Sequence, residues 1–276
     1  MNIITISRGS LSATEKLAQK VSEKLNCSVV TREDVLKAGE KYGIKESGLG
    51  DISFIEKSPS IWDKMSDRKK QYLACFQTAL LDFALKGSII YHGHLAQFLL
   101  GDIPFVLRVL LTAPMDFRIK TLMSEGGKSK EEVLSYIKLI DERRSKWSHF
   151  LYGVDWMNPS HYDVVLNLEK ISIDSASDLL ADFASQQEFQ SKPESLKVLK
   201  NLHLAAKARC YLQQSPRTKG SDVEIDADFE SGSLIVKGDT PKVGSNMWAN
   251  DIEEVLTKVE GVKSVKVIKL IVGYYE

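Results

Sequence analysis

The chain of 276 residues is 43% hydrophobic, and its 37 basic residues are balanced by 37 acidic ones, so the formal net charge at pH 7 is zero. This composition is typical of a globular protein, and the length suggests two domains. A balanced charge gives no reason to expect nucleic acid as a partner.

The apolar run at residues 3–6 is too short for the core of a signal peptide. No later segment approaches the roughly eighteen uninterrupted apolar residues of a membrane-spanning helix. We therefore expect a cytoplasmic protein without a transmembrane segment.

The three cysteines, Cys27, Cys75 and Cys210, are odd in number, far apart and outside any C-x-x-C spacing. This spacing predicts neither a disulfide framework nor a zinc site. We expect buried free thiols and no metal site.

The first elements predict the opening of a βα unit. Residues 3–6 are expected to form a short buried strand, residues 7–14 a loop of small and hydroxyl residues, and residues 15–25 a helix with apolar side chains at helical spacing. A second short strand follows at "CSVV", and Thr31 is expected to cap a helix that begins at Arg32.

Apolar strands and helices alternate through the middle of the chain. The segments "SIIYHGH", "FVLRVLLTA" and "YDVVLNL" predict further core strands. Helices are expected over residues 62–86, after Pro114 and around Asp141 to Trp147, and Ser129 with Glu132 predicts a capping box. The alternation predicts an α/β fold in which helices cover a parallel sheet.

A smaller domain is expected at the C-terminal end. The polar segment "SQQEFQSKPES" predicts a linker over residues 186–195, between a domain of residues 1–185 and a domain of residues 196–276. Acidic and apolar residues alternate over residues 222–230, which predicts an antiparallel strand with one solvated face. The expected order is helix, strand, strand, helix, strand, a small α+β (αββαβ) domain.

The loop after the first strand has part of a phosphate-binding pattern. A strand, a tight loop and a helix present backbone N–H groups to an anion. The complete pattern is G-x-x-x-x-G-K-[ST]. Counted from Gly9, it places Thr14, Glu15 and Lys16 where glycine, lysine and a hydroxyl residue belong.

Glu15 opposes phosphate binding, because a carboxylate repels phosphate. Arg8 and the hydroxyl groups of Ser10, Ser12 and Thr14 remain able to bind an anion. The loop chemistry alone leaves both a weakened phosphate site and a plain βα turn open.

Three segments resemble the cytidylate kinase-like family of P-loop nucleoside monophosphate kinases: "ITISR", "IIYHGHLAQFLLGDIPFVLRVLLTAPMDFRI" and "DERRSKWSHFLYGVDWMNPSHYDVVLNL". The similarity extends over roughly residues 1–180. It implies a P-loop kinase-like sheet, a phosphate loop after the first strand, an acceptor-nucleotide site, an arginine-bearing lid near residues 141–150, and use of ATP and Mg²⁺.

The resemblance also implies roles for individual residues. Asp141 and Arg144 match catalytic positions, Arg32 and Gly93 match substrate-binding positions, and His94 stands at a third substrate-binding position. The candidate cofactor-binding set is Arg8, Gly9, Ser10, Ser12, Ala13, Thr14, Lys16 and Arg118.

This chain departs from the family pattern at positions that usually carry cations. Glu15, His94 and His149 stand at three such positions. Because phosphoryl transfer depends on positioning and on cations around the transferred group, these replacements favour a kinase-like protein with weak or no catalysis. Such a protein would bind a nucleotide or another small anion and act in regulation.

Two alternatives stay open. One is a working CMP or AMP kinase that uses substitute cations, and the other is an interaction scaffold without a nucleotide site. The C-terminal segments "FESGSLIVKGDT" and "VEGVKSVKV" resemble a BON domain, which implies that residues 196–276 contact a ligand or a protein partner.

Overall fold

The computed structural model describes residues 1–8, 13–44, 67–127, 129–239 and 245–270. The chain divides into two compact units. The first comprises Met1–Asp34, Gly50–Pro59 and Lys86–Ser195, and the second comprises Val35–Leu49, Ser60–Leu85 and Leu196–Glu276. Each unit is described by itself.

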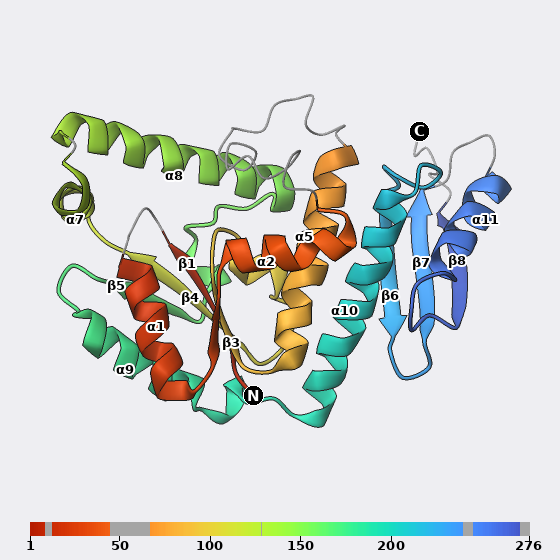
Figure 1. Ribbon diagram of the computed structural model, residues 1–276, viewed down its shortest axis with the longest axis horizontal. Coiled ribbons are helices and arrows are strands. Elements are labelled where there is room, and N and C mark those ends of the chain that lie inside the picture. The colour runs from red at the N-terminus through yellow and green to blue at the C-terminus, as the bar shows by residue number, and fades with distance from the viewer. Residues whose placement is uncertain (9–12, 45–66, 128, 240–244, 271–276) are drawn as a thin grey trace, which may run out of the picture. The chain divides into compact units, whose positions relative to one another are not determined.

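The first unit contains a five-stranded sheet in the order β2-β3-β1-β4-β5, and all its pairings are parallel (Figure 1). The strands are β1 (Ile3–Arg8), β2 (Ser28–Val30), β3 (Ile89–His92), β4 (Val106–Thr112) and β5 (Val164–Asn167). The predicted parallel sheet is therefore confirmed. Strand β1 is longer than expected because Ser7 and Arg8 still pair with Leu110 and Leu111 of β4.

Helices flank this sheet. They are α1 (Ala13–Leu25), the start of α2 (Arg32–Gly39), α6 (Ala96–Leu99), α7 (Met115–Gly126), α8 (Lys130–Tyr152) and α9 (Ile173–Ala184), with short 3-10 turns at Pro159–His161 and Gln187–Phe189. Helices α1 and α9 lie side by side on one face (Figure 1). Their apolar faces and the side chains of β1 and β4 form one core, with Leu17, Leu180 and Ile6 fully buried.

Local signals placed several helix ends correctly. The Thr31 hydroxyl accepts a hydrogen bond from the Asp34 amide at 3.1 Å. The capping box of Ser129 and Glu132 is present at the start of α8. Gly127 adopts a left-handed conformation (φ 58°) after α7, where glycine is favoured because it has no β-carbon.

The second unit contains a three-stranded sheet covered by helices. Strands β6 (Val223–Asp228) and β7 (Ser233–Asp239) are antiparallel, and β8 (Ser264–Leu270) runs parallel to β7. Helices α10 (Pro193–Gln214) and α11 (Ser245–Leu256) pack on it, and α5 (Asp67–Lys86) and a 3-10 turn (Glu40–Tyr42) belong to the same unit. The order α10-β6-β7-α11-β8 confirms the predicted small αββαβ fold.

The prediction of free thiols was wrong for two of the cysteines. Cys75 of α5 and Cys210 of α10 form a disulfide, and both are fully buried. They are 135 residues apart, and only the packing of α5 against α10 brings them together. Cys27 keeps a free thiol, and burial raises its pKa to about 11.

A half-buried carboxylate, that of Asp82, also connects these helices. Asp82 of α5 accepts hydrogen bonds from the Tyr42 hydroxyl and from His203 of α10, each at 2.8 Å, and pairs with Lys41 at 2.8 Å. Burial acts to raise the pKa of Asp82, but hydrogen bonds from His203, Lys41 and Tyr42 outweigh it and lower the pKa to about 2. The carboxylate is therefore ionised at neutral pH.

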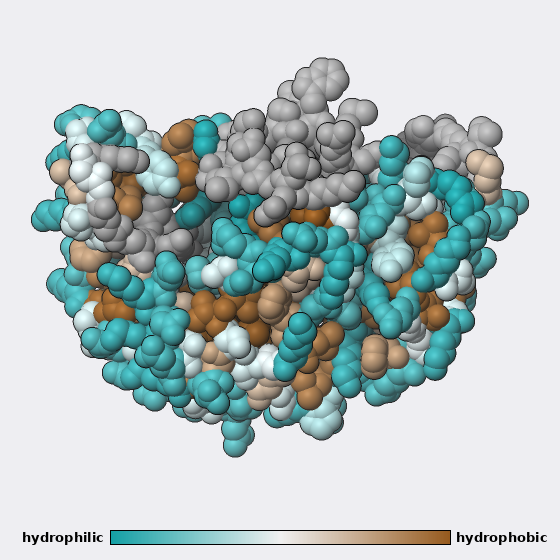
Figure 2. Space-filling model, viewed as in Figure 1, coloured by the Kyte–Doolittle hydropathy of each residue, from teal (hydrophilic) through white to brown (hydrophobic). Residues whose placement is uncertain are grey.

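On the face that Figure 2 shows, hydrophilic side chains predominate and apolar side chains gather in patches. No helix in the described ranges is long and apolar enough to cross a membrane.

Candidate functional site

The carboxyl ends of the parallel strands meet at one edge of the five-stranded sheet, where ligands of open α/β sheets bind. Strand β1 ends at Arg8, and α1 begins at Ala13. The candidate residues Gly9, Ser10 and Ser12 lie outside the described residues, so their roles stay predictions.

The first turn of α1 carries the other loop candidates. The helix begins at Ala13, two residues earlier than expected, and Thr14 is fully buried. Glu15 and Lys16 are exposed. A carboxylate in the first turn suits the positive end of the helix but opposes a phosphate that approaches the same end.

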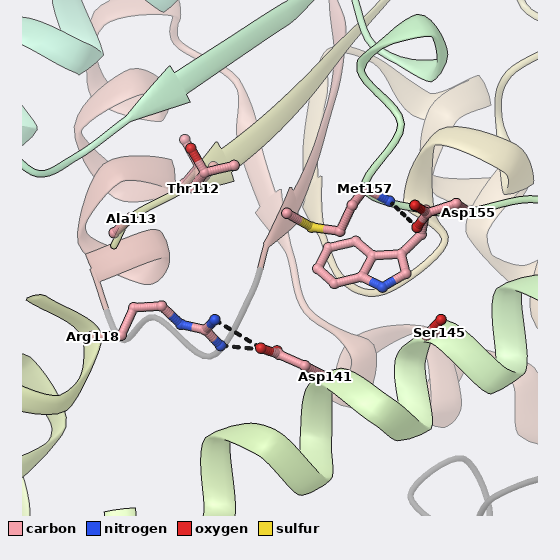
Figure 3. Close-up of a pocket in the computed structure, with 9 residues that line it drawn as sticks. Thr112, Ala113, Arg118, Asp141, Ser145, Asp155 and Met157 are labelled. Carbon is pink, nitrogen blue, oxygen red and sulfur yellow. Dashed lines mark hydrogen bonds and ion pairs between the residues drawn. The ribbon is translucent and has the colours of Figure 1, made fainter. Parts of the chain in front are cut away.

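A cavity of about 170 Å³ lies beside this edge (Figure 3). The end of β4 forms one side, α7 and α8 contribute polar side chains, and the Asp155–Met157 segment closes it. The lining residues are Leu111, Thr112, Ala113, Arg118, Asp141, Ser145, Asp155, Trp156 and Met157. The predicted residues Arg118 and Asp141 thus meet in one cavity.

Arg118 and Asp141 form a two-pronged ion pair across the cavity wall (Figure 3). Nη1 donates to Oδ2 at 2.7 Å and Nη2 donates to Oδ1 at 2.8 Å. Arg118 is 9% exposed, and its Nε has no hydrogen-bond partner among the described residues. Asp141 therefore neutralises the guanidinium, and a ligand must compete with that carboxylate.

His94 and Arg144 also lie together. The His94 Nε2 is 3.1 Å from the Arg144 carbonyl oxygen, and because that oxygen can only accept, Nε2 carries the proton. The ring meets Trp156 edge-on, with centroids 5.6 Å apart. Burial, and then the charge of Arg144, lowers the pKa of His94 to about 3. The imidazole is therefore uncharged at neutral pH.

The remaining candidates sit at the ends of other strands. Gly93 follows β3, and its amide donates to the Ile6 carbonyl oxygen at 3.1 Å. Arg32 is the first residue of α2, just after β2. Strand β3 separates β2 from β1, so the structure does not bring Arg32 into the cavity that Arg118 and Asp141 line. The side chain of Arg8 lies outside the described structure.

The helix that carries the expected lid residues is α8. His149 is exposed, and its Nδ1 donates to the Ser145 carbonyl oxygen at 2.8 Å. Lys146 pairs with Glu142 at 2.6 Å on the same helix. Neither residue lines the cavity, so α8 contributes Asp141 and Ser145 to it.

Sequence reasoning missed a chain of buried polar groups beneath this edge. The Ser7 hydroxyl donates to the Gln97 side-chain oxygen, the Gln97 amide donates to the Tyr162 oxygen at 2.8 Å, and Tyr162 donates to the Trp156 carbonyl oxygen at 2.6 Å. Gln97 is 2% exposed. Tyr162 lies in one of the three segments that resemble the cytidylate kinase-like family, but no pattern in the sequence pairs it with Gln97.

The chain turns sharply just before Gln97. Leu95 has a left-handed backbone conformation with φ 63°, which is uncommon for a residue with a β-carbon and often marks a functional site. Among the residues that the structure describes, no group of three or more His, Cys, Asp or Glu side chains is arranged to hold a metal ion.

Most of the chain is similar to known proteins. The model of the cytidylate kinase-like family matches residues 3–170. A cytidylate kinase of Ignicoccus hospitalis is 27% identical over 170 residues, which cover 60% of this chain and 90% of that relative. A cytidylate kinase of Staphylothermus marinus is 26% identical over 100 residues, 36% of this chain and 56% of that relative, so the chain spans little more than half of its length.

Among solved structures, an uncharacterized protein of Eubacterium ventriosum aligns with a TM-score of 0.47 at 19% sequence identity. The alignment covers 66% of this chain and 97% of that protein. The residues matched by the family model end before α10 begins at Pro193.

Proposed function

This chain belongs to the cytidylate kinase-like family, and we propose that it binds a nucleotide or another phosphate-bearing anion weakly, with little or no phosphoryl transfer. The ligand would lie at the carboxyl edge of the five-stranded sheet, near the cavity lined by Arg118 and Asp141. The role of such a protein would be regulatory.

The charge state of His94 carries this proposal. In kinases of this kind, positioned cations neutralise the transferred phosphoryl group, and a single arginine contributes about 10³-fold or more to the rate. With a pKa of about 3, His94 supplies no positive charge at neutral pH. Its half-buried ring also packs edge-on against Trp156, and a neutral imidazole there does not pair with a phosphate as a cation would.

Two further features weaken phosphate binding at the same edge. Arg118 is held by Asp141 through two hydrogen bonds of 2.7 and 2.8 Å, so a phosphate must displace a carboxylate to reach it. Glu15 places a second carboxylate in the exposed first turn of α1. These anions reduce affinity without blocking access, which supports weak binding and not its loss.

A working CMP or AMP kinase is the second candidate. The curated relatives named above are cytidylate kinases, and Arg118, Asp141 and Arg144 match the family pattern. ATP would bring Mg²⁺, which neutralises charge on the phosphate oxygens. The residues present fit that metal poorly, because Lys16 occupies the position of the loop hydroxyl that would bind it.

We propose that residues 196–276 make the regulatory contact. The order α10-β6-β7-α11-β8 is compatible with a BON-like domain. We assign to residues 196–276 the binding of a ligand or a protein partner, and this binding would regulate the kinase-like residues 1–185. If the first unit binds no nucleotide, a scaffold function becomes the better reading.

Calorimetric titration separates these functions. ATP, CMP and AMP are titrated into the full chain with and without Mg²⁺, and ADP formation is followed in the same samples. The proposal expects weak binding of at least one nucleotide and negligible ADP. Rapid ADP formation would establish that the chain is a working kinase. No heat of binding in any titration would favour an interaction scaffold.

A further inference from the structure

The buried polar chain beneath the sheet edge joins two parts of the site. We call Ser7, Gln97, Tyr162 and the Trp156 carbonyl group the Gln97 relay. Ser7 stands one residue before the end of β1, and Trp156 belongs to the wall of the cavity. Gln97, in the short helix α6, connects them through its two amide atoms.

The direction of each hydrogen bond in the relay is fixed by chemistry. The Trp156 carbonyl oxygen can only accept, so Tyr162 donates to it and must accept from Gln97. Burial raises the pKa of Tyr162 to about 12, so the hydroxyl keeps its proton. The residue at position 97 must therefore accept at one atom and donate at the other while remaining uncharged, which is what a primary amide does.

The Gln97 relay bonds to the Asp155–Met157 wall of the cavity at the Trp156 carbonyl oxygen. Within the wall, the Met157 amide donates to the Asp155 carboxylate at 2.9 Å, and the Asn158 amide donates to the Asp155 carbonyl oxygen at 3.1 Å. These bonds shape the turn itself. The bond from Tyr162 to Trp156 connects the turn, through Gln97, to the end of β1.

We infer that Gln97 is a positioning residue that fixes the Asp155–Met157 wall of the cavity relative to the end of β1, and thereby sets the affinity of the site for its ligand. The second part rests on the proposed function. The first part concerns the protein alone, so it is tested separately.

The structural part is tested by hydrogen exchange in the full chain, with Gln97→Leu as the variant. Leucine fills the space but breaks both bonds, so the amides of Met157 and Asn158 should exchange about tenfold faster than in the wild type. Gln213→Leu is the matched control. Gln213 is 4% exposed, lies in the other unit and bonds to Ser221 and Gly220 in the same two-sided way.

The control should destabilise its own unit and leave exchange at residues 155–158 unchanged. Equal protection of these residues in Gln97→Leu and in the wild type would overturn the positioning role. So would an equal loss of protection in the Gln213→Leu control, because the effect would then be general destabilisation.

Gln97→Glu adds a readout that loss of packing alone would not produce. An ionised carboxylate cannot donate to Tyr162, whereas the neutral carboxylic acid can, and burial favours the neutral form at mildly acidic pH. In Gln97→Glu, the amides of residues 155–158 should lose protection from exchange at pH 8 and regain it at pH 5, each time compared with the wild type at the same pH. A constant ratio across this range would contradict the donor role of position 97.

The ligand part is tested with ATP and CMP as probes. Gln97→Leu should lower the affinity for the nucleotide that binds by about fivefold or more, and Gln213→Leu should not. If wild type binds neither nucleotide, the proposed function fails while the exchange data still decide the positioning role. If exchange rises but affinity is unchanged, the wall does not set ligand affinity and that part of the inference is wrong.

Discussion

Replacing Glu15 by lysine is expected to raise the affinity for Mg²⁺-ATP about fivefold at physiological salt. Glu15 is exposed in the first turn of α1, at the helix end that faces the predicted phosphate site. The substitution removes one negative charge and adds one positive charge there. Because the Glu15 side chain is exposed, the change acts on charge with little effect on packing.

The magnitude follows from screened electrostatics. Two unit charges about 7 Å apart in water interact by about 0.6 kcal/mol, and salt at 0.15 M reduces this to about 0.25 kcal/mol. A change of two charges against a ligand that carries about two negative charges gives about 1 kcal/mol. This corresponds to about a fivefold change in the dissociation constant.

Glu23→Lys provides the matched control. It makes the same charge change on the exposed face of the same helix, eight residues further along (23 − 15 = 8). That spacing adds about 12 Å along the axis, where screening reduces the interaction below about 0.1 kcal/mol. Isothermal titration calorimetry at 0.05 M and 0.15 M salt should show tighter binding by Glu15→Lys, with a larger gain at low salt.

Two results would contradict an electrostatic role for Glu15. Unchanged affinity in Glu15→Lys would mean that no phosphate binds near the start of α1. An equal gain in Glu23→Lys would mean that net charge, and not this position, controls binding.

Three further predictions concern titration and the disulfide. His94 has a folded pKa of about 3, below its usual value near 6.5, so its imidazole NMR signals should stay flat between pH 5 and 8, and a midpoint near 6.5 would contradict its assigned neutral state. Asp82 has a folded pKa of about 2, below its unfolded value of 3.8, so its hydrogen bonds with His203 and the neighbouring groups stabilise the fold above pH 4. This contribution to the free energy of unfolding, about 2 kcal/mol, is lost as pH falls from 4 to 2. Urea unfolding of Asp82→Asn should lack this acid-dependent loss, and identical pH profiles for variant and wild type would exclude the carboxylate as its source. Reduction of Cys75–Cys210 should lower the free energy of unfolding by about 2 to 5 kcal/mol, and Cys75→Ser should be insensitive to reductant; a wild type equally insensitive would show that the bond does not stabilise the fold.

Features with local causes were predictable from the sequence. A hydroxyl residue before a helix satisfies free backbone amides within the same turn, so Thr31 and Ser129 marked helix starts correctly. Apolar runs that alternate with amphipathic helices predicted the parallel sheet, because such strands must be covered on both faces. The alternation of acidic and apolar residues over 222–230 predicted β6, because such a strand covers the core with one face and exposes the other to solvent.

Features that depend on distant partners were not predictable. The disulfide joins residues 135 positions apart, and no spacing rule links Cys75 to Cys210. Gln97 looked like an ordinary polar residue after a strand until the fold placed it between Ser7 and Tyr162. Their identities were visible in the sequence, but their proximity arises only from tertiary packing.

The candidate site was predictable in its residue types and not in their charge states. The sequence placed a histidine at a position that usually carries a cation, and the fold shows that burial keeps His94 neutral. The family resemblance implied a binding role for Arg118 and a catalytic role for Asp141, and the structure pairs them. A side chain's available charge depends on its neighbours and its burial, which a linear pattern does not specify.

The most direct test of the central claim is the turnover of the wild-type chain with Mg²⁺-ATP and CMP, repeated with AMP, and followed as ADP formation. Kinases of this class typically turn over about 1 to 100 times per second. We expect a kcat at least about a thousandfold below that range, since a single positioned arginine contributes that much. A kcat of about 1 per second or more, from protein free of contaminating kinase, would contradict this expectation.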